Sequence, residues 1–101
     1  MKIEVFYVPG CPNHEPAVEA VTNVLASEAL ETEICEVPVR SEGEAQLLEF
    51  PGSPTVRVDG RDVEPESASM FGFACRLYMN GMGVPSEAMI RNAVLAAREK
   101  E

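Results

Sequence analysis

The hydrophobic positions along the chain change their period several times, and each period predicts a different element. Residues 2–8 alternate apolar and polar at first and then become continuously apolar, which is typical of an inner strand of a sheet. Residues 14–28 have apolar side chains at helical spacing, which predicts an amphipathic helix. Its apolar face carries Ala17, Val18, Val21, Val24 and Leu25. Residues 32–39 predict a second strand, which ends near Pro38.

Two further helices are marked by the residues that begin them. Ser41 and Glu44 have the spacing of a capping box, which predicts a short helix within residues 41–50. Ser86 is expected to cap the last helix of the chain. The apolar face of that helix carries Ile90, Ala93, Val94 and Ala97.

A hairpin and an irregular segment fill the rest of the chain. Short strands at 55–58 and 61–64 flank an Asp-Gly pair at 59–60, which is a strong signal for a two-residue turn. Residues 65–85 contain several Gly, Pro, Met and Phe without a clean period. We expect an irregular insertion there, with one helical turn around 74–78.

The order of these elements predicts an α/β fold. The first half is a βαβ unit with parallel strands and a right-handed crossover, and the hairpin adds antiparallel strands. The expected architecture is therefore a four-stranded mixed sheet flanked by about three helices. We expect one domain over residues 1–101, a length that can enclose a single modest core.

Composition and charge narrow the classes of function. The chain is 46% hydrophobic, as globular proteins are, and no apolar run is long enough to span a bilayer. Its net charge is −9, and its eight Lys and Arg are scattered, which argues against a nucleic-acid partner. The N-terminus leads directly into a strand and does not resemble a signal peptide. A cytoplasmic protein without a membrane partner is expected.

The chain has three cysteines, Cys11, Cys35 and Cys75. An odd count in a reducing compartment argues against a scaffold of structural disulfides. Two interpretations stay open. The three cysteines are either one reactive pair and one buried thiol, or three unrelated thiols.

Three short motifs carry a resemblance to a known family. Residues 10–14 (GCPNH) follow the first strand at a helix start, residues 52–55 (GSPT) enter the hairpin, and residues 58–61 (VDGR) form its turn. In this order they resemble the thioredoxin-like superfamily over most of the chain, apart from residues 65–85. More narrowly, the sequence is similar to small bacterial thioredoxin-like proteins, some of them described as mercury-related.

The resemblance implies a thiol-redox site. Cys11 matches the nucleophilic cysteine of the family, but His14 stands where the resolving cysteine would be. The resemblance also implies a cis peptide bond before Pro54, with the Ser53 backbone free to pair with an extended peptide or mixed disulfide. Pro12, Ser53 and Pro54 are therefore the candidate substrate-binding residues.

The position of Cys11 favours a reactive thiolate on physical grounds. A helix N-terminus offers free N–H groups and the positive end of the helix dipole. The ring of His14, one turn along, can donate to the sulfur or carry a positive charge beside it. Pro12 suits the first helical position, where no N–H is needed. The alternative is that Cys11 is a small turn residue and His14 a solvated side chain.

Cys75 lies in the irregular insertion and is the candidate resolving thiol for a Cys11–Cys75 disulfide. Its alternative is a buried apolar cysteine. Arg76 is a candidate source of positive potential for a thiolate or an anionic ligand. Cys35 shares an alternating strand face with Val37 and Val39 and is interpreted as part of the core.

These residues lead to three functional hypotheses. The first is thiol–disulfide exchange through Cys11, possible as enzyme chemistry on a protein or small-molecule thiol or disulfide, with no cofactor. The second is a soft-metal protein that binds mercury or copper(I) through Cys11 and Cys75, since soft ions prefer thiolates. The third is a non-catalytic interaction module that forms a homodimer through the Met- and Phe-rich segment. The Met and Phe side chains of that segment are expected to pack onto the core.

Overall fold

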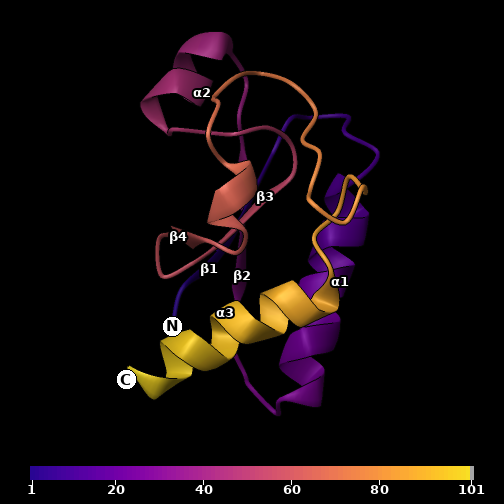
Figure 1. Ribbon diagram of the computed structural model, residues 1–101, viewed down its shortest axis with the longest axis vertical. Coiled ribbons are helices and arrows are strands. Elements are labelled where there is room, and N and C mark those ends of the chain that lie inside the picture. Colours follow the sequence, from indigo (N-terminus) through magenta and orange to yellow (C-terminus); the bar gives the residue numbers. More distant parts are fainter. Residues whose placement is uncertain (101) are drawn as a thin grey trace.

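The computed structural model describes residues 1–100, and Glu101, the last residue of the expected domain, lies outside it (Figure 1). In chain order the elements are β1 (Ile3–Tyr7), α1 (His14–Ser27), β2 (Ile34–Pro38), α2 (Glu42–Leu47), β3 (Thr55–Val58), β4 (Arg61–Asp62), the 3₁₀ turn η1 (Pro65–Ser67) and α3 (Glu87–Glu99). None of the helices within residues 1–100 combines the length and apolarity needed to cross a membrane.

The four strands form one mixed sheet in the order β2-β1-β3-β4. β1 pairs in parallel with β2, with Ile3 opposite Ile34, and antiparallel with β3, with Ile3 opposite Val58. β3 and β4 complete the antiparallel hairpin, whose register places Val58 opposite Arg61. The predicted α/β architecture, with an inner first strand and a mixed four-stranded sheet, is confirmed.

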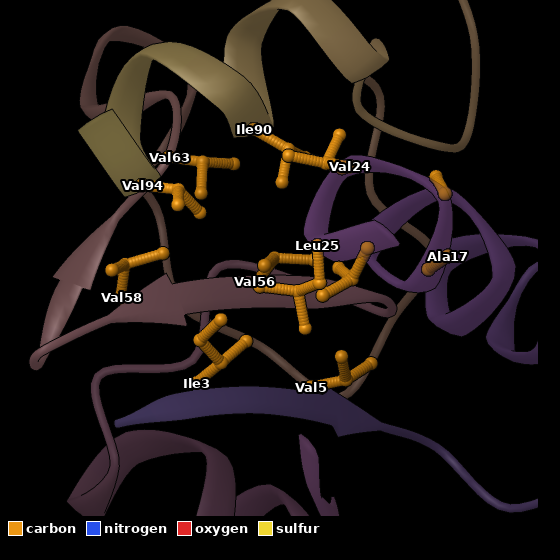
Figure 2. Packing of buried hydrophobic residues seen from close by; sticks show 12 residues of the cluster. Ile3, Val5, Ala17, Val24, Leu25, Val56, Val58, Val63, Ile90 and Val94 are labelled. Carbon is orange, nitrogen blue, oxygen red and sulfur yellow. The ribbon is translucent and has the colours of Figure 1, made fainter. Parts of the chain in front are cut away.

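One face of the sheet is covered by α1 and α3 (Figure 2). Alternate residues of β1 and β3 point toward these helices, and their apolar side chains meet the apolar faces of both helices. The buried members are Ile3, Val5, Ala17, Ala20, Val21, Val24, Leu25, Val56, Val58, Val63, Ile90 and Val94. Helical and strand periodicity alone predict most of this layer.

The opposite face is covered by α2 and by the insertion that follows β4. A smaller cluster of Phe6, Val39, Ala45 and Phe50 packs beneath α2. Arg57 of β3 also lies on this face, with its guanidinium carbon 4.7 Å from the centre of the Phe6 ring. It donates hydrogen bonds of 2.8 Å to the carbonyls of Leu48 and Glu49, which end α2.

The signals at the ends of elements are borne out. Ser41 and Ser86 each accept a hydrogen bond of 3.1 Å from the backbone N–H three residues later. Asp59 and Gly60 both have positive φ, 52° and 81°, as a two-residue hairpin turn of this type requires. The return bond of the capping box differs, because the Glu44 carboxylate accepts from the Arg40 N–H rather than from Ser41.

The insertion differs from its prediction in one respect. Its helical turn lies at residues 65–67, whereas residues 74–78 contain none, so the helical turn expected there is wrong. The reason is backbone pairing, since Cys75 forms an isolated parallel bridge with Ser53, which a helical turn could not make. β4 is also shorter than expected, ending at Asp62.

Candidate functional site

Cys11 lies in a turn between β1 and α1, half-buried at the end of the sheet. Its N–H donates to the Val8 carbonyl at 3.0 Å, and its own carbonyl accepts from the His14 N–H at 3.2 Å. α1 begins at His14, with Asn13 at the N-cap position. Pro12 therefore precedes the helix, and the prediction that it takes the first helical position is wrong, because the chain makes one more turn before the helix starts.

His14 is held by partners other than the thiol. Its ring stacks on Tyr7, with centroids 3.6 Å apart and planes inclined by 5°. Its Nε2 lies 2.6 Å from a carboxylate oxygen of Glu36 on β2. Within residues 1–100 no hydrogen bond joins the His14 ring to the Cys11 sulfur. Because Glu36 fixes Nε2, Nδ1 is the ring atom left for any chemistry at Cys11.

The Pro54 loop lies directly beside this turn. The peptide bond between Ser53 and Pro54 is cis, as the resemblance implies. The Ser53 hydroxyl accepts a hydrogen bond of 2.9 Å from the N–H of Val8, the residue whose carbonyl holds Cys11. Thr55 closes the loop by donating to the Gly52 carbonyl at 2.6 Å. Two hydrogen bonds through Val8 thus connect the loop to the cysteine turn.

The backbone of Ser53 is occupied by the chain itself. Its N–H donates to the Ala74 carbonyl at 2.8 Å, and its carbonyl accepts from the Arg76 N–H at 3.0 Å. Cys75 is therefore the residue paired with Ser53. The expectation that the Ser53 backbone is free is wrong, because residues 72–78, here named the strap, fill that position.

The strap is tied at both ends. Near its start, the N–H of Gly72 donates to the Phe50 carbonyl at 2.9 Å, and the N–H of Phe73 donates to the Glu42 carboxylate at 2.8 Å. At its other end, the buried hydroxyl of Tyr78 donates to the Pro54 carbonyl at 2.7 Å. The strap therefore connects α2 to the Pro54 loop.

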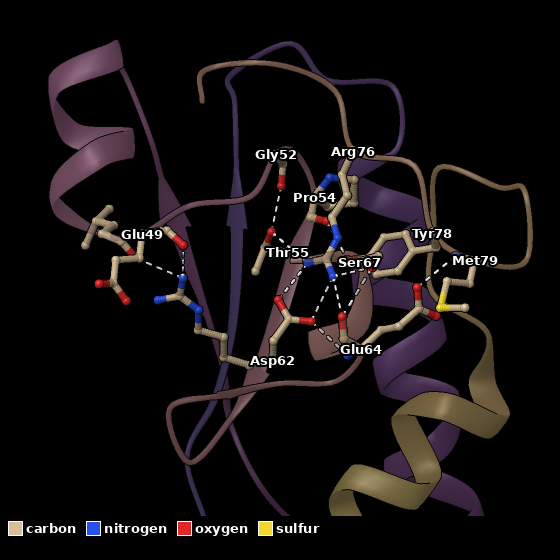
Figure 3. Close-up of polar contacts among 12 residues, drawn as sticks. Glu49, Gly52, Pro54, Thr55, Asp62, Glu64, Ser67, Arg76, Tyr78 and Met79 are labelled. Carbon is tan, nitrogen blue, oxygen red and sulfur yellow. Dashed lines mark hydrogen bonds and ion pairs between the residues drawn. The ribbon is translucent and has the colours of Figure 1, made fainter. Parts of the chain in front are cut away.

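Arg76 fixes the middle of the strap (Figure 3). It is only 4% exposed and forms a two-pronged ion pair with Asp62 of β4, with N–O distances of 2.7 and 2.9 Å. The guanidinium also donates to the Ser67 hydroxyl at 2.8 Å and lies 4.2 Å from the centre of the Tyr78 ring. These partners hold the guanidinium in a buried structural network. Its charge is paired with Asp62, in place of the thiolate or anionic ligand predicted for Arg76.

Gly52 and Glu64 make two further contacts at the strap and directly after it. Gly52 has φ of +124°, and a Cβ there would lie 3.0 Å from the Cβ of Arg76, so only glycine fits against the strap. Glu64 is 3% exposed, and its carboxylate accepts from the Met79 N–H at 2.7 Å, just beyond the strap. The strap is therefore closely packed at Arg76, and the residue that follows it is also held by a hydrogen bond.

Two titratable groups of this region are shifted. The N–H of Phe73 and then the side chain of Gln46 hold the pKa of Glu42 below its usual range, because both hydrogen bonds favour the carboxylate. Burial raises the pKa of Tyr78 well above that of a free tyrosine, because the charged phenolate would be poorly solvated there.

The three cysteines are all free thiols. Cys75 is exposed rather than buried, and the strap brings it beside the Pro54 loop without a disulfide to Cys11. Cys35 is also exposed, so its predicted place in the core is wrong. It lies on the edge strand β2 opposite Glu4. The apolar cluster beneath α2 does not extend to this part of the sheet.

The apolar side chains of the insertion are on the surface, contrary to the expectation that they pack onto the core. Six large ones are exposed: Met70, Phe71, Phe73, Leu77, Met79 and Met82. The polar network around Arg76 holds the backbone of this region, so these side chains are not needed to anchor it.

Other features of the molecule offer less chemistry. A pocket of about 460 Å³ lies between the hairpin and α3, near Val58, Asp59 and Lys100. Asp59 contacts Lys2 at the start of β1, so this pocket is at the opposite end of β1 from Cys11. Within residues 1–100 no group of three or more His, Cys, Asp or Glu side chains is placed to hold a metal ion.

Sequence reasoning did not find most of the strap's anchors. Asp62, Tyr78 and Glu42 are far in sequence from the groups they bind, and no local spacing marks them. The one signal was an arginine within the apolar stretch GFACRLY, since an arginine that becomes buried needs a charged partner.

No protein-family model matches the chain, and comparisons with curated proteins and with solved structures find no match. The assignment of a function therefore rests on the residues and contacts described above.

Proposed function

We propose that the chain has a thioredoxin-like fold and takes part in thiol–disulfide exchange through Cys11, with Cys75 as the resolving thiol. The sheet order β2-β1-β3-β4, with α1 and α3 together on one face, supports the fold. The cis bond before Pro54 is in the place that the resemblance implies.

One observation carries the proposed function: hydrogen bonds of Ser53 connect it both to the turn of Cys11 and to the segment that carries Cys75. Its hydroxyl binds Val8, whose carbonyl holds the Cys11 turn, and its backbone pairs with Cys75. The bridge with Ser53 thus brings Cys75 to the Pro54 loop, which is itself hydrogen-bonded to the turn of Cys11. Chain segments 64 residues apart in sequence supply the pair.

The reaction proceeds in two exchanges. The Cys11 thiolate attacks a disulfide, forming a mixed disulfide and releasing one thiolate. The thiol of Cys75 then loses its proton, and the Cys75 thiolate attacks the Cys11 sulfur. This releases the second thiol of the substrate and leaves a Cys11–Cys75 disulfide. The substrate disulfide gains two electrons and the protein loses two, so the exchange balances.

Single-turnover exchange with 2-hydroxyethyl disulfide tests this function. The background is Cys35→Ser, because the exposed Cys35 would otherwise react. We expect Cys11→Ser to reduce exchange to the slow rate of the exposed Cys75 alone, and Cys75→Ser to accumulate the mixed disulfide on Cys11. Unchanged exchange in Cys11→Ser would reject the function, and rapid resolution in Cys75→Ser would reject the role of Cys75.

A second candidate function, a homodimer through the insertion, has its own observation. Leu77 and Met79 are 69% and 72% exposed, in a segment where four further large apolar side chains are exposed. Large exposed apolar side chains become a contact surface where they lie side by side. Sedimentation velocity across a concentration series tests it, with Leu77→Ser and Met79→Ser expected to weaken a dimer and Ala26→Ser on α1 as the control. A monomer at millimolar concentration would exclude it.

A further inference from the structure

The pairing of the strap with Ser53 restricts which disulfides can reach Cys11. An extended peptide is recognised by a strand edge when its backbone pairs with unpaired N–H and C=O groups. Both such groups of Ser53 are already paired with Ala74 and Arg76. A peptide could gain these two hydrogen bonds only by removing the strap.

Removing the strap would break a buried network. The Arg76–Asp62 ion pair has side chains that are 1% and 10% exposed, and the Tyr78 hydroxyl would lose the Pro54 carbonyl. Breaking one side of a buried ion pair leaves an uncompensated charge, which is strongly unfavourable. The closeness of Gly52 to the Arg76 backbone also leaves no space for a second chain between the loop and the strap.

The insertion also reaches the cysteine turn. Gly83 packs so closely on the Asn13 side chain that a Cβ at this position would overlap it. Asn13 lies two residues after Cys11, so the insertion contacts both the Pro54 loop and the turn that carries the thiol. A polypeptide that ran past Cys11 along Ser53 would meet the insertion at both places.

We propose that the substrate of Cys11 is a low-molecular-weight disulfide and that the strap excludes extended peptides. This rests on the thiol–disulfide function proposed above and names its substrate class. A small disulfide needs only a path to one sulfur and no backbone pairing, so the occupied Ser53 does not oppose it. The two exchanges then consume one small disulfide and release two small thiols.

Single-turnover rates with two probes test the proposal, again in Cys35→Ser. The small probe is 2-hydroxyethyl disulfide. A neutral probe is chosen because the chain carries a net charge of −9, which would attract or repel a charged one. The peptide probe is an uncharged nine-residue peptide whose central cysteine is joined to 2-mercaptoethanol. Loss of the Cys11 thiol is followed by mass spectrometry, and each rate is divided by that of free N-acetylcysteine with the same probe.

We expect the normalised rate with the peptide to be at least tenfold below that with the small disulfide. Arg76→Ala should raise the peptide rate at least tenfold and change the small-probe rate less than threefold. Tyr78→Phe, which keeps the ion pair, serves if Arg76→Ala does not fold, and should raise the peptide rate about threefold. Arg61→Ala, at an exposed position on β4, is the control and should change neither rate.

Equal normalised rates with the two probes in the parent protein would overturn the substrate class. A slow peptide that stays slow in both strap variants would overturn the strap as its cause. If Cys11 reacts with neither probe faster than N-acetylcysteine, the proposed function itself fails, which is a separate result.

Discussion

The two faces of the sheet are covered in physically different ways. On one face α1 and α3 bury a continuous apolar cluster around Val24, Val56 and Ile90. On the other, the strap is held by hydrogen bonds and by the ion pair of Arg76 with Asp62, while its apolar side chains are exposed. The first layer stabilises the fold, and the second positions Cys75 beside the Pro54 loop.

This difference explains what the sequence could predict. Burial against a sheet requires apolar residues at a regular spacing, so the helix over residues 14–27 and the strands are visible as periods. The caps at Ser41 and Ser86 and the turn at 59–60 are equally local signals. The strap has no period, because its backbone and Arg76, rather than a row of apolar side chains, make its contacts.

The candidate site divides in the same way. The turn of Cys11 and the cis bond at Pro54 follow from local motifs and the resemblance. The pairing of Ser53 with Cys75 does not, since it joins segments 22 residues apart through backbone atoms that any sequence possesses. The exposure of Cys35 depends on how far α2 extends over the sheet. The residue pattern within β2 alone cannot predict this.

The largest effect is expected from Arg76→Ala. Removing one partner of a buried ion pair costs about 3–5 kcal/mol of unfolding free energy, because the Asp62 carboxylate stays buried without its cation. Urea denaturation measures the loss, and amide hydrogen exchange should show it first at Ser53 and Arg76. An effect below about 0.5 kcal/mol, like that expected of the exposed Arg61→Ala, would show that the network contributes little.

Ile90→Ala in the apolar layer should have a slightly smaller effect on stability but a wider one on exchange. The lost burial and the cavity cost about 2–5 kcal/mol, since Ile90 is fully buried between α3 and the sheet. Protection should fall together in β1, β3 and the strap, because this layer supports the whole fold. Asn92→Ala, on the exposed side of α3, is the control. Loss of protection confined to the strap would contradict the distinction between the two layers.

Tyr78→Phe isolates one hydrogen bond of the strap. It leaves the buried Pro54 carbonyl without the donor that lies 2.7 Å away, at a cost of about 1–3 kcal/mol. Tyr7→Phe removes a hydroxyl but keeps the ring that stacks on His14, and should cost less. Thermal unfolding compares the two variants, and equal losses would mean that the Tyr78 bond has no particular role.

The smallest effect is a pH dependence at Glu42. Its pKa is lowered below 4.5 in the folded protein, so the stabilisation is complete above the unfolded value and is lost as pH falls through the folded one. The Phe73 amide resonance should therefore shift in acid below about pH 4.5, as the carboxylate is protonated. Glu42→Gln should remove this shift. A Phe73 resonance that shifts alike in Glu42→Gln would contradict the assignment.

Peptide mapping of the oxidised protein tests the central claim most directly, that the strap supplies the thiol missing from the Cys11 motif. The protein is treated with one equivalent of 2-hydroxyethyl disulfide, free thiols are alkylated, and intact mass and peptides are measured. We expect the loss of two protons, mapped to a Cys11–Cys75 disulfide and reversed by reduction, with Cys35 alkylated. If Cys11 is instead found alkylated, bound only to 2-mercaptoethanol or joined to Cys35, the claim is contradicted.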